Sequence, residues 1–225
     1  MIEIKTMISL NKEIVNCKKC KRLVEFREKI ASEKRKQYEN EVYWGKPITG
    51  FGEINAQVII VGLAPAAHGG NRTGRVFTGD KSATFLYRCL NKVGISNLND
   101  STKVDDGLKL KKTYITTALK CVPPQDKPTA NELIECFNFF KQEIDELKKS
   151  KKIIALGKIA FDACIKYYKK FYNFNDKVKF IHSEKYLMPD NKELYCCYHP
   201  SPRNVNTGRI NEKMMISFLK KVFEL

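Results

Sequence analysis

Four short runs dominated by apolar residues constrain the fold of this chain more than any other feature. They are rich in β-branched and aromatic residues and occupy positions 57–62, 113–119, 152–156 and 193–198. Continuous apolar runs of this length are typical of parallel strands that are buried on both faces. Stretches with helical periodicity lie between and after them, at positions 82–93, 129–149, 158–171 and 211–223. This alternation predicts a three-layer α/β/α fold around a central, mainly parallel four-stranded sheet.

The first part of the chain has a different character. Residues 5–40 are highly charged and helical in pattern, with a break near Cys17 and Cys20, and a loop dense in glycine and aromatic residues follows at 43–53. A length of 225 residues suits one hydrophobic core better than two. We therefore expect a single domain, 1–225, in which residues 1–45 form a helical arm.

The charge balance indicates a polyanionic partner. Lysine and arginine number 41 against 25 acidic residues, which gives a net charge of +16, and such an excess is typical of proteins that bind nucleic acid. Any single basic cluster, such as residues 18–22 or 148–152, is equally compatible with a solvated helix face. No run approaches the ~18 apolar residues of a membrane span, and the start lacks a signal-peptide layout. We expect a cytosolic protein without a membrane partner.

Chemically dense segments follow the predicted strands. Residues 62–80 (GLAPAAHGGNRTGRVFTGD) follow the first, 120–124 the second and 199–209 (HPSPRNVNTGR) the last. Because ligands bind beyond the carboxyl ends of parallel strands, these segments should meet in one pocket. The glycine-rich segment lets the backbone approach a ligand, but it matches neither a P-loop nor the dinucleotide fingerprint. The polar stretch 97–112 is expected to be an exposed connection.

Several residues in these segments are candidates for chemistry. Asp80 precedes a predicted helix, so capping that helix is its alternative role. Phe77 would by default belong to the core. His199 lies at a predicted strand end and not on an apolar helical face, which favours a functional role. His182 does not lie among other candidate residues and is predicted to be structural, while the role of His68 is open.

Eight cysteines in a chain without an export signal argue against a disulfide framework. Four of them stand out by position, and this set comprises Cys17, Cys20, Cys121 and Cys136. They could hold a soft metal such as zinc or an iron–sulfur cluster, and their spacing favours the cluster only weakly. The others lie in apolar stretches, where cysteine is usually a small buried hydrophobe, and they are Cys89, Cys164, Cys196 and Cys197.

The two long loop motifs at 62–80 and 199–209, joined by the four-cysteine pattern, resemble the uracil-DNA glycosylase superfamily, specifically family 5, the second iron–sulfur type of archaea and bacteria. The likeness extends from the first cysteine pair to the final helix. It implies hydrolysis of the N-glycosidic bond of uracil in DNA, as in base excision repair. It also implies a 4Fe–4S cluster bound by Cys17, Cys20, Cys121 and Cys136. We expect the enzyme to be a monomer.

The resemblance also implies residue roles. Asp80 corresponds to a carboxylate that orients water or stabilises the developing cation, and His199 to a donor that contacts the base. Phe77 is the candidate for stacking on a flipped base. The other residues expected to contact base or DNA are Gly62, Ala64, Pro65, Thr117, Ser201, Arg203 and Asn204.

Two positions bear on which bases are accepted. Leu63 stands where other families carry an acidic residue or asparagine, and this absence is typical of family 5. Thr117 stands where iron–sulfur relatives often place asparagine, and one hydroxyl reads a base edge less completely than an amide. We expect a broader range that includes hypoxanthine. The alternatives are a family 4 enzyme specific for uracil and a non-catalytic iron–sulfur DNA-binding module.

Overall fold

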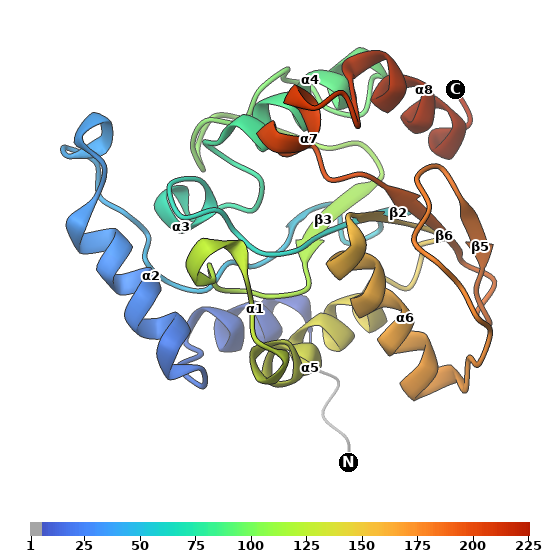
Figure 1. The fold of residues 1–225 in the computed structure, drawn as a ribbon, viewed down its shortest axis with the longest axis horizontal. Helices are drawn as coiled ribbons and strands as arrows, with labels where there is room; N and C mark the ends of the chain where they lie inside the picture. The colour runs from blue at the N-terminus through green and yellow to red at the C-terminus, as the bar shows by residue number, and fades with distance from the viewer. Residues whose placement is uncertain (1–5) are drawn as a thin grey trace.

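A computed structural model describes residues 6–225, so the predicted helical character of residue 5 and the first five residues of the arm lie outside it. A six-stranded mixed sheet forms the centre (Figure 1), with strand order β1-β3-β2-β4-β6-β5. The strands are β1 (Phe51–Gly52), β2 (Val58–Gly62), β3 (Thr113–Thr117), β4 (Lys152–Leu156), β5 (Lys185–Leu187) and β6 (Glu193–Cys197).

The four predicted strands correspond to β2, β3, β4 and β6, which pair in parallel as the middle of the sheet. The predicted strand number of four was too low, because β1 and β5 pair antiparallel at the two edges. These edge strands are two and three residues long and partly exposed. They therefore carry no continuous apolar run by which the sequence could reveal them.

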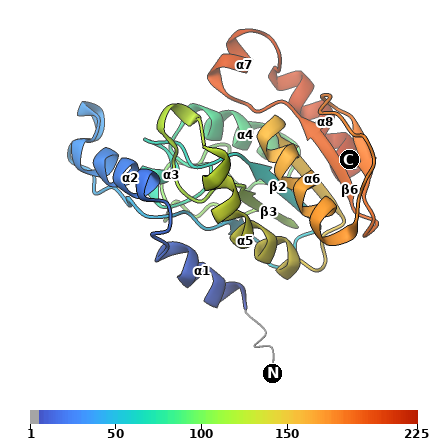
Figure 2. The ribbon, with the colours of Figure 1, turned by 60° about the horizontal axis from the view of Figure 1, so that its bottom comes forward.

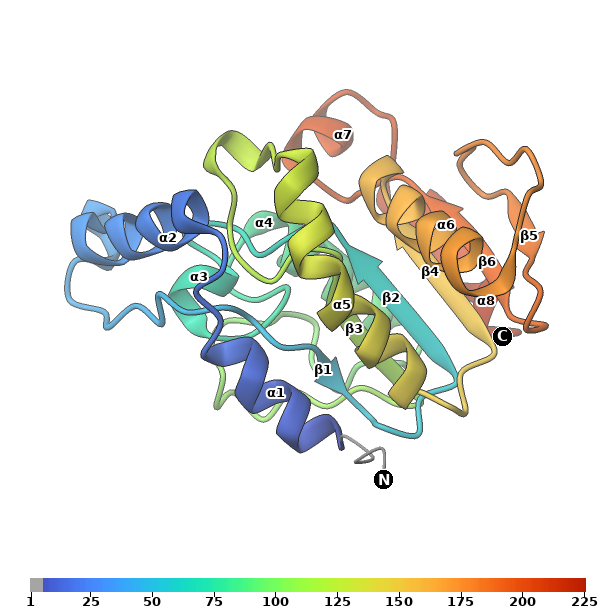
Figure 3. The same ribbon diagram turned by 90° about the horizontal axis from the view of Figure 1, so that it is seen from below.

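Helices cover both faces of the sheet (Figures 1 and 3), as the α/β/α prediction requires. One face carries α1, α5 and α6, and the other carries α4 and α8. Within residues 6–225 the helices are α1 (Met7–Val15), α2 (Lys21–Glu33), α3 (Gly70–Thr73), α4 (Lys81–Lys92), α5 (Ala130–Glu146), α6 (Lys158–Tyr172), α7 (Pro202–Asn206) and α8 (Glu212–Phe223), with 3₁₀ turns η1 (Lys36–Tyr38) and η2 (Pro124–Asp126).

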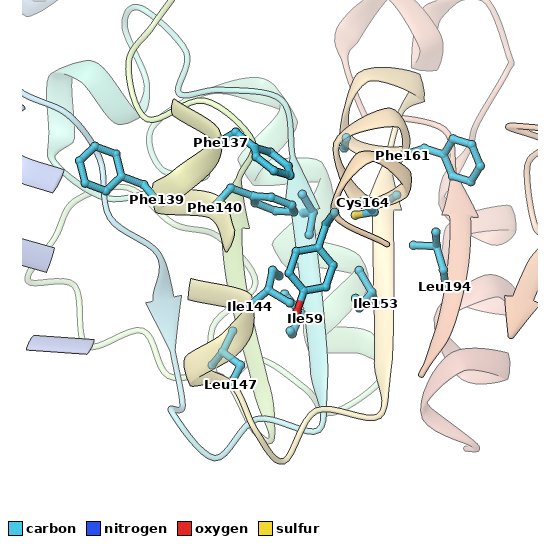
Figure 4. Close-up of a cluster of buried hydrophobic side chains, with 14 of the residues drawn as sticks. Ile59, Phe137, Phe139, Phe140, Ile144, Leu147, Ile153, Phe161, Cys164 and Leu194 are labelled. Atoms are coloured by element: carbon cyan, nitrogen blue, oxygen red, sulfur yellow. The ribbon is translucent and has the colours of Figure 1, made fainter. Parts of the chain in front are cut away.

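Side-chain alternation along β2 divides the interior into two cores. Ile59 and Val61 belong to the core on the side of α5 and α6, which also contains Phe140 and Phe161; Figure 4 shows part of this core. Residues at the alternate positions of β2 face α4 and α8 in the second core. Full burial of each such side chain contributes about 1.5–3 kcal/mol. Apolar residues that face either core are therefore stabilising, which explains why the runs show no apolar–polar alternation.

The N-terminal arm is helical with a break at the first cysteine pair, as predicted. Helix α1 packs on α5 through Leu10 and Ile14, both fully buried. Helix α2 begins directly after Cys20 and runs away from the sheet (Figure 2). No helix in residues 6–225 has the length and apolar character needed to cross a membrane.

Candidate active site

The loops at the carboxyl ends of the parallel strands converge, and the register of the sheet fixes how they do so. Gly62 at the end of β2 pairs with Thr117 at the end of β3. The end of β6 is tied to the end of β4 because Gly157 N donates to Cys197 O at 2.8 Å. A Cβ placed on Gly157 would lie 3.4 Å from the Cβ of His199. The strand ends thus adjoin in two pairs at this edge of the sheet, where the sequence predicts a common pocket.

The ring of Phe77 lies at the centre of this edge. A Cβ placed on Gly62 would lie 2.7 Å from Phe77 Cε2 and 3.5 Å from Thr117 Cγ2, so the ring rests on the glycine. Its centroid is 5.9 Å from that of His199, with an interplanar angle of 30°. Phe77 adopts a left-handed backbone with φ of 47°, a conformation that costs energy for a bulky residue. Such strain is typical of functional loops.

Asp80 divides its two carboxylate oxygens between different neighbours. Oδ1 accepts hydrogen bonds from Ser82 N at 2.8 Å and Ala83 N at 3.0 Å, which caps α4. Oδ2 faces Gly69, where a Cβ would clash with it. Burial raises the pKa of Asp80 above its ordinary value, against the lowering effect of the two amides. The capping role and the free oxygen therefore coexist in one side chain.

Arg72 supports Asp80 and was not identified from the sequence. Its side chain is buried and donates from Nε to His68 O at 2.8 Å and from Nη2 to Gly79 O at 3.1 Å. It also pairs with Glu41, and its positive charge lowers the pKa of Asp80. The only sequence feature that pointed to Arg72 was its location inside the 62–80 motif.

His199 is held in its loop by Asn204. Asn204 Nδ2 donates to His199 O at 2.8 Å, and Ser201 Oγ accepts from Asn204 N at 3.4 Å at the start of α7. Burial lowers the pKa of His199 to about 4, so its imidazole is neutral near pH 7. Arg203, on the same short helix, is exposed. The loop thus offers a neutral ring inside and a cation outside.

The other candidate residues of the 62–80 loop pack against neighbouring parts of the structure. Pro65 is buried against Gly70, where a Cβ would lie 2.9 Å from the proline Cβ, and Ala64 is half-buried against the α5 core. The Nδ1 atom of His68 is 2.9 Å from the hydroxyl of Tyr43. This contact between Tyr43 and His68 therefore links the arm to the glycine-rich loop.

His182 supports the strand that precedes His199. Its ring stacks on Tyr198 with centroids 4.8 Å apart, and its Nδ1 accepts from Tyr198 N at 3.2 Å. Burial lowers the pKa of His182. These contacts are those of a structural histidine.

The four singled-out cysteines border one largely apolar cavity, whose wall also includes Leu23, Leu119 and Phe139. Hydrogen bonds already reach two of the sulfurs, from Lys120 N to Cys136 at 3.2 Å and from Arg27 Nη1 to Cys121 at 3.1 Å. Among residues 6–225, however, no three His, Cys, Asp or Glu side chains stand in an arrangement that could hold a metal ion.

The chemistry around these cysteines fits a negatively charged group. Arg27 is 2 % exposed, and its Nε has no hydrogen-bond partner. Within residues 6–225 its ion pair is with the exposed Glu28, at a long distance of 4.0 Å. A buried guanidinium without a close counter-charge is unfavourable, and thiolates bound to a cluster would compensate it. The residues present are therefore compatible with an iron–sulfur cluster.

The other four cysteines are buried in the two cores, as expected for small hydrophobes, and they are Cys89, Cys164, Cys196 and Cys197.

Comparison with known proteins gives a consistent family assignment. A family model described as uracil DNA glycosylase superfamily matches residues 49–223. The chain is 41% identical over 208 residues to the type-5 uracil-DNA glycosylase of Pyrobaculum aerophilum, covering 92% of this chain and 88% of that protein. It is 39% identical over 209 residues to the type-5 enzyme of Thermus thermophilus, covering 93% of each. A type-4 uracil-DNA glycosylase of Pyrobaculum aerophilum is 31% identical over 122 residues, 54% of each chain.

Proposed function

The chain belongs to the uracil DNA glycosylase superfamily, and we propose that Asp80 and His199 are the catalytic residues of a base pocket built around Phe77. The enzyme removes uracil from DNA by hydrolysis of the N-glycosidic bond, a step of DNA repair that leaves an abasic site. One observation carries the residue assignment. The ring of Phe77 contacts the glycine of β2 and lies beside His199, with Asp80 three residues later.

Phe77 is the stacking surface for the flipped base. Extrusion of a base from the duplex costs a few kcal/mol, which stacking and edge hydrogen bonds recover. Gly62 leaves the ring room beside the strand end, and Thr117 lies against the same glycine. Thr117 is thus the residue that reads the base edge. Ala64 and Pro65 form the backbone of the loop beneath it.

Asp80 and His199 act on opposite charges of the transition state. As the bond breaks, positive charge grows on the sugar and negative charge grows on the uracil. The Asp80 oxygen not used in capping provides an anionic field and an acceptor for water. The neutral ring of His199 donates an N–H to the base oxygen without adding a cation beside the sugar. One preorganised donor of this kind contributes about 10²–10³ in rate.

The loop that carries His199 also contacts the DNA. Arg203 is exposed on α7 and suits a backbone phosphate, while Ser201 and Asn204 shape the turn that enters the duplex. The net charge of +16 supports binding to a polyanion. The enzyme acts as a monomer on nucleoid DNA in the cytoplasm.

The base range extends beyond uracil to hypoxanthine. A threonine at position 117 offers one hydroxyl, which imposes fewer requirements on the base edge than an amide does. The pocket therefore discriminates less strongly against a deaminated purine.

A 4Fe–4S cluster is bound by Cys17, Cys20, Cys121 and Cys136. The shared cavity and the uncompensated Arg27 support this assignment. When bound, the cluster supplies a crosslink between the N-terminal arm and the segment after β3, and it has no part in the hydrolysis, which moves no electrons.

A glycosylase assay tests the proposal. Labelled duplexes with one uracil or one hypoxanthine are incubated with wild type, Asp80→Ala and His199→Ala, and alkali converts abasic sites to strand breaks. We expect wild-type cleavage of both substrates and losses of at least ~10²-fold in both variants. Binding without any abasic sites would instead leave a non-catalytic DNA-binding module. Cleavage of uracil alone would remove hypoxanthine from the range.

A further inference from the structure

The segment from Ser96 to Leu110 is largely exposed, as expected, and it is also a closed, structured loop. An antiparallel bridge joins Ser96 to Leu110 at its base. Across the loop, Asn97 Nδ2 donates to Gly107 O at 3.0 Å. Near its tip, Asp106 accepts from the backbone N–H groups of Thr102 and Leu108, each at 3.0 Å. A loop that is fixed in this way can hold another segment in place.

The segment held by this loop is the one that carries Phe77 and Asp80, and Arg75 joins the two. The guanidinium is 4 % exposed and lies over the ring of Phe51, 4.9 Å from its centroid. Its hydrogen bonds run from Nε to Thr78 Oγ1 at 2.9 Å, from Nη2 to Ser101 Oγ at 2.8 Å and Asp106 Oδ2 at 2.6 Å, and from Nη1 to Val104 O at 3.3 Å. Every nitrogen of this buried cation is satisfied.

The contacts of the loop reach the residue before the catalytic carboxylate. Gly79 N donates to Ser101 O at 2.7 Å, and the hydroxyls of Thr78 and Ser101 are 2.7 Å apart. On its other side, Gly79 O accepts from Arg72. Hydrogen bonds therefore hold the peptide that precedes Asp80 from both sides. The strained backbone of Phe77 lies between Arg75 and the hydrogen-bonded Gly79. Strained conformations persist only where the surrounding structure fixes them.

We propose that Arg75, Ser101 and Asp106 are positioning residues for uracil excision, which hold Phe77 and Asp80 in their working places without contacting the substrate. A buried ion pair is a weak device for stability alone, since apolar residues of similar size commonly serve as well. A network that fixes orientation at a strained functional loop has a different use, because small displacements of a reacting group are costly in rate. The inference rests on the proposed function of Asp80 and Phe77.

The test compares Asp106→Asn with Asp105→Asn in the full-length protein. Asp105 is the neighbouring acid, but its side chain is 74% exposed and pairs with the exposed Lys103 at 3.6 Å, so it serves as the matched control. We expect Asp106→Asn to lower the single-turnover rate of uracil release at least tenfold, with the Kd for the uracil duplex changed less than twofold. Asp105→Asn should keep the wild-type rate, which also establishes the glycosylase activity independently of the network.

Two further readouts separate positioning from loss of folding. Ser101→Ala removes one hydroxyl without leaving a buried charge, and we expect it to fold normally and to lose about threefold to tenfold in rate. Hydrogen exchange at the Gly79 amide should accelerate in Asp106→Asn while the amides of β2 stay protected. The inference is overturned if folded Asp106→Asn and Ser101→Ala release uracil at the wild-type rate. It is overturned equally if their rates fall only where exchange shows global unfolding.

Discussion

Asp80 directs one carboxylate oxygen at the start of α4 and the other at Gly69, whose missing side chain makes the space for it. Capping and the proposed chemistry therefore use different atoms of one residue. A β-carbon at position 69 would lie 2.2 Å from the second oxygen, so this close approach requires a glycine. The two roles can be separated by substitution.

Asp80→Asn keeps an oxygen for the amides of Ser82 and Ala83 but removes the charge. We expect a loss of at least ~10² in single-turnover rate with little change in the free energy of unfolding. Asp80→Ala should lose the same rate and about 1 kcal/mol of stability, because the cap is also removed. The matched control is Asn211→Ala, which removes the cap of α8, where Asn211 Oδ1 accepts from Met214 N at 2.9 Å. It should lose stability alone. A wild-type rate in Asp80→Asn would contradict the catalytic role.

The pH dependence of the rate should show an acidic limb that belongs to Asp80. Burial raises the pKa of this carboxyl above its ordinary value of 3.8. The carboxylate is the active form, so the rate falls as the pH falls through the raised pKa. Single-turnover rates between pH 4 and 8 measure the limb, and Asp80→Asn should abolish it. A limb that persists in Asp80→Asn and disappears in His199→Gln would assign the titration to His199 instead.

Most of the fold could be predicted because buried strands give a strong hydrophobic signal in the sequence. The runs at 152–156 and 193–198 became β4 and β6 with ends within one residue, since every strand residue after the first is buried in one of two cores. Edge strands β1 and β5 gave no such signal. Their pairing is decided by contacts with β3 and β6, which no local pattern records.

The sequence indicated the residues proposed to contact the base or the reacting atoms, but not the residues that hold them in place. Asp80, Phe77 and His199 follow strand ends, which is a position that can be read from the chain. Arg72 and Arg75 depend on partners such as Glu41 and Asp106, about 30 residues away in sequence. Such long-range polar networks form only when the chain is folded, so the sequence alone showed two arginines in a glycine-rich loop.

Gly62→Ala should displace the ring of Phe77. The new Cβ would lie 2.7 Å from Cε2 and 2.9 Å from Cζ of that ring, closer than packed atoms tolerate. We expect a rate loss of roughly 10–100-fold with the sheet intact. Phe77→Leu serves as the partner in a double-mutant cycle. Because Phe77→Leu removes the clash together with the stacking, the double variant should be no slower than Phe77→Leu alone. Independent, multiplying losses would show that Gly62 does not act through the ring.

Thr117→Asn should narrow the base range. An amide offers both a donor and an acceptor to the base edge, and a polar group that a wrong base leaves unpaired penalises that base. We expect the ratio of uracil to hypoxanthine release to rise about tenfold, which corresponds to about 1.4 kcal/mol of discrimination. Thr117→Val, which keeps the shape and removes the hydroxyl, is the control and should not raise the ratio. An unchanged ratio in Thr117→Asn would show that this position does not read the base.

The cysteine assignment predicts which thiols carry iron. Cys17→Ser and Cys136→Ser should each lose the iron, the acid-labile sulfide and the visible absorbance of the purified protein, which for wild type should contain about four iron atoms per chain. Both should also lower the melting temperature, because Cys17 belongs to the arm and Cys136 to α5, and the crosslink between them is lost. Cys89→Ala and Cys164→Ala change thiols buried in the two cores, and these controls should keep their iron. Wild-type protein that contains one zinc and no sulfide would replace the cluster by a zinc site at the same four residues. Full iron in Cys17→Ser would remove Cys17 from the ligand set.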